Sequence, residues 1–384
     1  MRKAWIAGVL LCGGVVLWIA AGSEAGKPSP PPSSTVDSGI IYYAGGSGIC
    51  SMKPDGTGKT VLFSWSDLEA LGFDRLEEHQ FEPSWGTHGG ERWFLVTLPV
   101  PDGSGGSETW PDGSVREEVY ALTADGESVR LTDGWLLDGD GVVTGWIAPH
   151  DMLHSWADDG STTDGMVSFL GQEYGMVGDD WAVVERTEHL YVVTFDPEDL
   201  PGASALDLVP ERIGLPLPLI TTYPGNLGYS WSPGGQALIF RTYEDPSTPA
   251  TEAGLWRGDF AGGEWTVGST ALHDSGKHPR WSRTGDGSKD RVIFFYSDIL
   301  SMTPDGTDLR TVIVKPANTR KLTKRLSHPH WSPKATHIVY MLSALTTSAT
   351  GDVDVYRAAA DGSGQTNLTG DTSDNAWPLG WRAE

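Results

Sequence analysis

The sequence predicts an all-β chain that folds as a six-bladed β-propeller of four-stranded antiparallel blades. Three observations predict it: tryptophan recurs at a fixed spacing, a short β-rich segment follows each of these tryptophans, and an Asp-Gly turn motif recurs in each unit. Outside the first 25 residues, no window shows the 3.6-residue apolar period of an amphipathic helix. A unit of about 40–50 residues with four strands is typical of a propeller blade.

Six tryptophans mark the innermost strand of each predicted blade. They are Trp85, Trp156, Trp231, Trp281, Trp331 and Trp381. The last four are spaced by 50 residues, and the earlier gaps of 71 and 75 residues indicate the same unit with insertions. We expect these large rings to pack between neighbouring blades.

The second, third and fourth strands of each unit follow from β-propensity and turn chemistry. Second strands rich in β-branched and aromatic residues are predicted at 39–45, 92–98, 166–172, 237–243, 291–297 and 337–343. The third strand ends in Asp-Gly, as at 298–306, and these two residues suit a tight hairpin. A fourth strand follows, as at 310–314.

The two ends of the propeller are predicted to share one blade. Residues 39–63 supply three strands without a preceding tryptophan, and the segment around Trp381 supplies an inner strand without followers. Together they complete one blade, which closes the ring and removes two sheet edges. The propeller is therefore expected to extend over residues 39–384.

The N-terminal segment predicts export. Arg2 and Lys3 precede an apolar run, and a small-x-small site ends at Ala25, so residues 1–25 are expected to be a signal peptide. An uncleaved membrane anchor is the alternative. Residues 26–38 form a Pro/Ser-rich linker, and the protein is expected to be periplasmic, secreted or on the cell surface. Removal of Cys12 with the leader would leave Cys50 alone, so no intrachain disulfide is expected.

The charge balance excludes some partners. Lys and Arg number 27 against 51 Asp and Glu, a net charge of −24. Such a chain repels nucleic acid and anionic lipid surfaces, so membrane contact is expected only through a retained N-terminal segment.

The repeat resembles a known family. Pro-x-Trp-Ser-Pro, a strand, and Ile-x-x-Met-x-Pro-Asp-Gly resemble the TolB-like propeller repeat, a WD40-like variant, and residues 229–240, 278–306 and 328–340 carry the pattern. The second and third blades depart most from it, with GTHGG after Trp85 and ADDGSTTDG after Trp156. The resemblance implies protein–protein binding outside the cytoplasm. The same repeat also forms the propeller part of some peptidases, and related propellers form oligogalacturonate lyases.

Insertions are predicted to gather on one face. The long connections join the fourth strand to the next blade or the second strand to the third, and both kinds emerge on the same side. They are 64–82, 99–117, 133–153, 173–188, 200–228, 244–253 and 344–353. Polar residues that precede the inner strands should surround the channel mouth on this face, and these are the candidate binding residues. They are Glu82, His150, His154, His278, Arg280, His328 and His330.

A divalent metal is the alternative use of this mouth. Neutral imidazoles with a carboxylate suit a transition metal, and the candidate ligands are His150, His154, His278, His328 and Glu82. The other interpretation is that His-Pro begins the inner strand and bonds to neighbouring loops, in which case no cofactor is expected.

The function predicted from these features is a binding scaffold without catalytic activity, whose partner is a protein or peptide. The sequence contains no G-x-S-x-G, H-E-x-x-H, phosphate-loop or C-x-x-C motif. The alternatives are a metal-dependent carbohydrate-active propeller, with cations of blades five and six at the mouth, and a structural repeat in a larger assembly.

Overall fold

The computed structural model describes most of the chain beyond the linker. Contacts divide the chain into residues 1–35 and 36–384, and only the second unit is described below. The described residues are 36–73, 81–149, 155–156, 165–177, 180–184, 189–214, 228–242, 254–262, 264–284, 287–318, 322–346, 352–370 and 375–384. No helix in these ranges has the length and apolar character needed to span a membrane.

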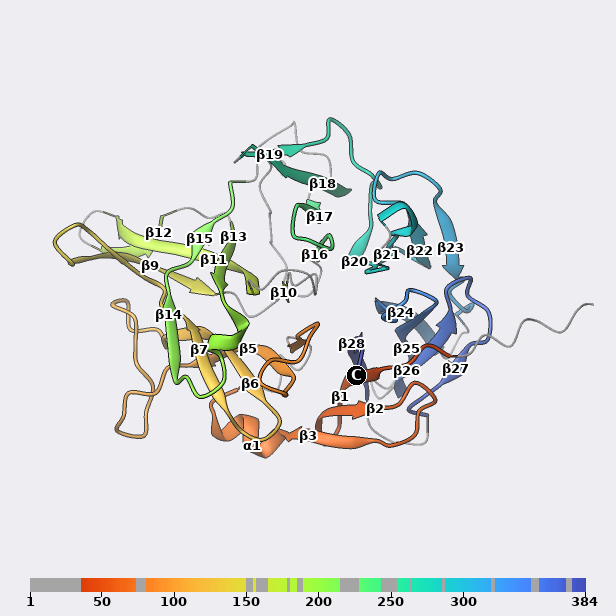
Figure 1. The fold of residues 1–384 in the computed structure, drawn as a ribbon, viewed down its shortest axis with the longest axis horizontal. Coiled ribbons are helices and arrows are strands. Elements are labelled where there is room, and N and C mark those ends of the chain that lie inside the picture. Colours follow the sequence, from red (N-terminus) through yellow and green to blue (C-terminus); the bar gives the residue numbers. More distant parts are fainter. Residues whose placement is uncertain are drawn as a thin grey trace, which may run out of the picture. The chain divides into compact units, whose positions relative to one another are not determined.

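Five sheets contain a blade of four antiparallel strands (Figure 1). The first comprises β28 (Trp377–Arg382), β1 (Ile40–Gly45), β2 (Gly48–Met52) and β3 (Thr60–Ser64). The second comprises β4 (Glu82–Pro83), β5 (Trp93–Pro99), β6 (Glu117–Thr123) and β7 (Ser128–Thr132), and β14 (Ala205–Leu208) adds to β7 in parallel. The third comprises β16 (Tyr229–Trp231), β17 (Ala237–Thr242), β18 (Gly254–Ala261) and β19 (Glu264–Val267). The fourth comprises β20 (Lys277–Trp281), β21 (Val292–Phe295), β22 (Ile299–Met302) and β23 (Arg310–Ile313). The fifth comprises β24 (Leu322–Trp331), β25 (His337–Thr346), β26 (Asp352–Ala359) and β27 (Thr366–Asn367).

A seven-stranded sheet lies in the chain between the second and third of these blades. Its strands are β8 (Trp135–Leu137), β9 (Val143–Pro149), β10 (Ser155–Trp156), β11 (Gly165–Val177), β12 (Asp180–Val183), β13 (His189–Phe195) and β15 (Glu211–Arg212). Strand β11 has 13 residues and serves two sets of partners. Its first half pairs with β10 and β13, and its second half pairs with β9 and β12. The strands β8, β9 and β12 with the end of β11 form what we call the side sheet.

The prediction of six four-stranded antiparallel blades is therefore wrong. The described residues form five such blades and one seven-stranded sheet, and the all-β propeller class is the part that holds. The difference arises because the insertions at 133–153, 173–188 and 200–228 are not plain connections. They contain the added strands β8, β9, β12, β14 and β15.

An aromatic cluster joins the side sheet to the connection between β5 and β6. Trp146 is fully buried and stacks on two rings. Its ring centre lies 5.5 Å from that of Trp110 and 5.0 Å from that of Tyr174. The guanidinium of Arg116 lies 5.3 Å from the ring centre of Trp110. Because burying such rings contributes several kcal/mol, the insertion at 99–117 is held against the side sheet.

The predicted closure by the two ends of the propeller is confirmed. Strand β1 pairs with β28, and Ile41 lies opposite Trp381. Gly39 has a φ of 119°, and a Cβ there would lie 2.2 Å from the carbonyl oxygen of Arg382. The start of β1 can therefore approach β28 this closely only with glycine.

Tight turns of the predicted kind close the outer hairpins. In the turn after β22, the Asp305 carboxylate accepts hydrogen bonds from the Thr307 amide at 3.0 Å and the Thr303 hydroxyl at 2.5 Å. These bonds lower the pKa of Asp305 to about 2. Gly306 follows with a φ of 84°, which favours glycine.

The core lies between neighbouring sheets. One cluster joins Ile293 and Val312 of one blade to Trp331 and Ile338 of the next. The tryptophans also link inner strands: the indole N–H of Trp331 donates to the Arg280 carbonyl at 3.1 Å, and that of Trp156 donates to the Glu82 carbonyl at 3.1 Å. The prediction that these rings pack between blades is therefore confirmed for Trp156 and Trp331.

Candidate functional site

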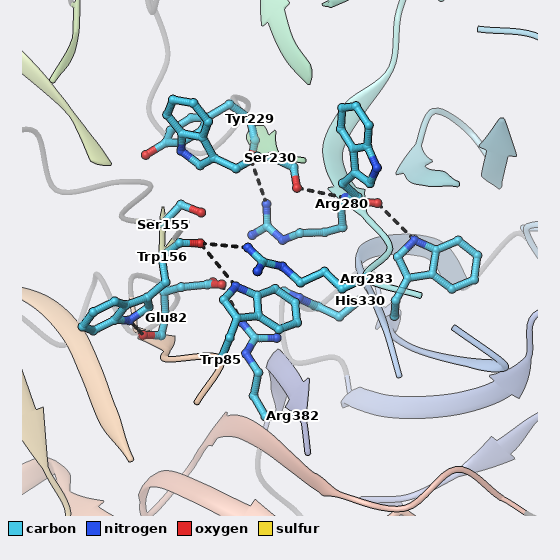
Figure 2. A pocket seen from close by; sticks show the side chains of 13 residues that line it. Glu82, Trp85, Ser155, Trp156, Tyr229, Ser230, Arg280, Arg283, His330 and Arg382 are labelled. Atoms are coloured by element: carbon cyan, nitrogen blue, oxygen red, sulfur yellow. Dashed lines mark hydrogen bonds and ion pairs between the residues drawn. The ribbon is translucent and has the colours of Figure 1, made fainter. Parts of the chain in front are cut away.

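The innermost strands of all six sheets line one small cavity at the channel. Each contributes at least one side chain, including Glu82, Trp156, Tyr229, Arg280, His330 and Arg382 (Figure 2). The open volume is about 20 Å³, which holds a water molecule or a small ionic group. Any larger ligand must place only a small group in this cavity.

Arg280 brings a positive charge to the cavity, and the acceptors that the described part of the chain gives it are backbone carbonyls. Its Nη1 donates to the carbonyl oxygens of Pro279 at 3.1 Å and Tyr229 at 3.4 Å. Its Nε is buried and has no hydrogen-bond partner among the residues that the structure describes. A buried donor without an acceptor costs about 1–3 kcal/mol, so an acceptor from a ligand would stabilise this group.

Arg283 and Trp85 lie beside Arg280. Arg283 extends toward Trp156, and its Nη2 donates to the Trp156 carbonyl at 3.4 Å (Figure 2). The guanidinium carbons of Arg283 and Arg382 lie 4.1 Å and 3.7 Å from the ring centre of Trp85. Contacts of this kind contribute about 0.5–2 kcal/mol each and hold both cations in place. Strand β4 ends at Pro83, so Trp85 lies beyond the strand and is only half-buried, unlike the other five tryptophans of the repeat.

Glu82 of β4 and Arg382 of β28 form a buried ion pair between the second blade and the closing blade. Arg382 Nη2 lies 2.6 Å from Glu82 Oε1, and the side chain of Arg382 is 1% exposed. Arg382 Nε also donates to the Pro83 carbonyl at 3.1 Å. Burial lowers the pKa of Arg382 to about 10, which leaves it charged at neutral pH. Glu82 is thus engaged in holding the inner strands together.

The cavity is electropositive although the protein is acidic. Three arginines face one carboxylate among the described lining residues, which gives a net charge of about +2. His330 adds none at neutral pH, because burial and the neighbouring Arg280 and Arg382 lower its pKa well below 6.5. Tyr229 stays protonated because burial raises its pKa, and its hydroxyl lies 3.0 Å from the Ser168 hydroxyl. This arrangement favours an anionic group.

His330 should make stability depend on pH. The unfolded chain binds a proton at this histidine below about pH 6.5, whereas the folded chain does not until a much lower pH. The free energy of unfolding should therefore fall as the pH drops below about 6.5, by up to about 1.4 kcal/mol per pH unit from this residue. Urea unfolding at several pH values, with His330→Gln beside the wild type, measures it.

Comparing the wild type with His330→Gln isolates the contribution of His330 to the pH dependence of stability. Burial raises the pKa of Glu118 to about 7, which has the opposite effect on stability but is present in both proteins. A His330→Gln profile parallel to that of the wild type would show that the folded chain protonates His330 over the same pH range as the unfolded chain.

His278 and His328 occupy equivalent positions in two adjacent blades. Their ring centres are 4.4 Å apart, and each has a φ of 49° although a proline follows. This conformation is strained, and the strand register shifts at both positions, between Lys277 and Arg280 and between Ser327 and His330. The shifts reset which side chains of β20 and β24 face the channel, which places Arg280 and His330 in its wall.

The predicted site residues separate into three groups. The structure brings Glu82, Arg280 and His330 to one cavity, and it places His278 and His328 against each other. His150 and His154 lie outside the described residues. Within the described ranges no group of three or more His, Cys, Asp and Glu residues is arranged to hold a metal ion.

Sequence reasoning missed Trp85, Arg283 and Arg382 as channel residues. The departure from the repeat after Trp85 was the available signal for the first. Arg382 directly follows the repeat tryptophan Trp381, and Arg283 follows Trp281 by two positions, where the repeat has a turn residue. Whether the side chains of Arg283 and Arg382 point into the channel depends on how the inner strands fold.

Comparisons with known proteins leave the family open. No family model matches the chain, and no curated protein matches it. Similar solved structures include a Kuenenia stuttgartiensis hydrazine synthase (10% identity, 90% of this chain and 47% of that chain, TM-score 0.47) and the Hadza microbial sialidase Hz136 (12%, 78% and 61%, 0.40). An α-L-arabinofuranosidase from Lactobacillus brevis is also similar (12%, 76% and 94%, 0.38). The chain spans about half of the length of the first of these, and likeness at this level assigns neither an activity nor a ligand.

Proposed function

We propose that this protein is an exported propeller of the TolB-like kind without catalytic activity, which binds a protein or peptide partner through an anionic group of that partner. The anionic group enters the channel cavity and accepts hydrogen bonds from Arg280 and Arg283. The observation that carries the proposal is the buried Arg280 Nε, a donor on a charged group that has no acceptor among the described residues. The histidine–proline motifs that resemble the family's repeat also form the bulges beside this cavity.

A carboxylate suits the size and charge of the cavity. The two guanidinium groups offer paired donors, which match the two oxygens of a carboxylate. About 20 Å³ admits such a group but not the chain that carries it, so the rest of the partner would lie on the surface around the mouth. We propose the insert-rich face for that contact.

A carbohydrate-active enzyme is the second candidate, and the same arginines favour it. They would hold the carboxylate of an acidic sugar as readily as that of a peptide. Formation of unsaturated product from oligogalacturonate, with and without added divalent metal, separates the two functions. We expect no product under either condition, and metal-dependent product would establish the enzyme.

Arg280→Gln should weaken partner binding strongly. Loss of a charge-assisted contact in a buried site costs about 2–5 kcal/mol, so we expect the affinity to fall by a factor of about 30 or more. The immobilised full chain captures partners from an envelope extract, and surface plasmon resonance then measures the affinity of each captured protein.

Lys53→Gln is the matched control, because it removes the same charge at an exposed turn after β2. It should leave the affinity within a factor of about two, since surface substitutions have small effects. If Arg280→Gln binds the captured protein as well as Lys53→Gln does, the channel is not the binding site.

A further inference from the structure

A second cavity lies between the blade of β20–β23 and the blade of β24–β27. Its volume is about 440 Å³, which is in the range of small-molecule sites. Of the described residues that line it, Trp331 alone also lines the channel cavity. It is therefore a separate candidate site, and its ligand is independent of the function proposed above.

The floor of this cavity is apolar. Val312 of β23 and Trp331 of β24 are buried, and Ala335 and Ala360 lie beside them. These residues continue the hydrophobic core between the two blades to the surface. An apolar group of a ligand would be removed from water here at about 25 cal/mol per Å² of buried area.

The rim of the cavity carries four cations, Lys289, Arg291, Arg310 and Lys334. Asp308 bridges the two arginines, with Oδ2 at 2.9 Å from Arg291 Nη1 and Oδ1 at 2.9 Å from Arg310 Nε. Asp361 is the one carboxylate in the described lining. The Asp37 carboxylate also accepts a hydrogen bond from the Lys334 amide at 2.8 Å. Among the described residues, four cations therefore lie beside three carboxylates, which leaves about +1.

Asp308 orders the two arginines. Its backbone carbonyl accepts a further bond from Arg291 Nη2 at 2.8 Å, and Ser301 accepts from Arg291 Nε at 3.1 Å. These donors of Arg291 are bonded to acceptors within the protein. Arg291 therefore contributes positive charge to the cavity and not these hydrogen bonds. Lys289 and Lys334 are exposed on the rim and contribute positive charge there.

We propose that this cavity binds a tetrahedral oxyanion, a phosphate or sulfate ester, that is carried on an apolar group. Lysine ammonium groups suit such an anion as compact point charges, and the hydroxyl of Thr311 in the same lining adds a neutral donor. The gathering of cations at an apolar cavity is unusual in a protein of net charge −24, because four cations lie beside three carboxylates among the residues that the structure describes.

Phenyl phosphate is the test probe, and isothermal titration of the full chain measures its affinity. We expect saturable binding, and we expect inorganic phosphate to bind about tenfold more weakly because it leaves the apolar floor unfilled. Benzoate should also bind about tenfold more weakly, because its planar carboxylate offers two acceptor oxygens where a phosphate or sulfate ester offers three. Phenyl sulfate in a parallel titration distinguishes the two esters. An absence of phenyl phosphate binding, or equal binding of benzoate, would overturn the proposal.

Variants locate the binding. The double variant Lys289→Ala/Lys334→Ala should lower the affinity for phenyl phosphate at least about tenfold, and both residues are exposed, so the fold should tolerate the change. Lys53→Ala, at an exposed turn, should leave it unchanged. Loss of binding in Arg280→Gln with retention in the double variant would place the anion in the channel and refute this second site.

Discussion

Arg382→Met is expected to lower the free energy of unfolding by about 3–5 kcal/mol. The substitution leaves the Glu82 carboxylate in a buried position without its ion-pair partner, and it removes the bond from Arg382 Nε to the Pro83 carbonyl. Urea unfolding followed by circular dichroism measures the change.

Two further variants separate the ion pair from simple loss of packing. Glu82→Leu/Arg382→Met removes both charges, so we expect it to recover much of the lost stability. Arg130→Met is the matched control, because the ion pair of Arg130 with Asp207 at 2.7 Å is partly exposed, with side chains 22% and 49% accessible, and should contribute at most about 1 kcal/mol. A cost for Arg382→Met no larger than that for Arg130→Met would mean that the pair does not stabilise the inner strands.

Trp381→Ala is expected to cost about 3–5 kcal/mol, because the side chain is fully buried at the pairing of β28 with β1. The ring packs in the core cluster that contains Ile41, Val339 and Val355, and its N–H donates to the Ser38 carbonyl at 3.3 Å. Loss of the ring therefore loosens the contact between the closing blade and its neighbour. The same urea experiment measures the effect.

Trp85→Ala makes the identical chemical change at a half-buried position beside the channel. We expect it to cost less than half as much as Trp381→Ala, because less area leaves water on folding. The reverse ranking would contradict the assignment of Trp381 to the closing core and of Trp85 to the channel wall.

The sequence was sufficient where the repeat is regular. The spacing of Trp231, Trp281 and Trp331 and the Asp-Gly turns predicted strands that the structure places within a few residues, because each feature is fixed by local chemistry. The closure of β1 on β28 followed from counting strands. These predictions needed no knowledge of distant contacts.

The seven-stranded sheet could not be predicted in this way. The end of β11 and the segments of β8, β9 and β12 become a sheet only by pairing with each other. Their short apolar stretches have the same local pattern as a connection between strands. Which of these segments pair with each other is decided by the tertiary structure. From sequence alone, residues 133–153 and 173–188 are therefore interpreted as two insertions.

The channel was predicted only in part for a related reason. The positions of Glu82, Arg280 and His330 before their tryptophans indicated the channel mouth. Period-two alternation along a strand does not anticipate the register shifts at His278 and His328, which decide which side chains turn inward. Arg283 and Arg382 consequently had no distinguishing signal.

The long strand β11 has a practical consequence for spectroscopy. One continuous backbone runs from the strands beside the channel into the side sheet, and Gly171 pairs with His189 of β13 as well as with Pro149 of β9. No linker separates the two regions, so the side sheet should tumble with the ring as one body. A fluorophore attached at the exposed β8–β9 turn would then report the rotation of the entire propeller, and its anisotropy would register the docking of a large partner elsewhere on the molecule.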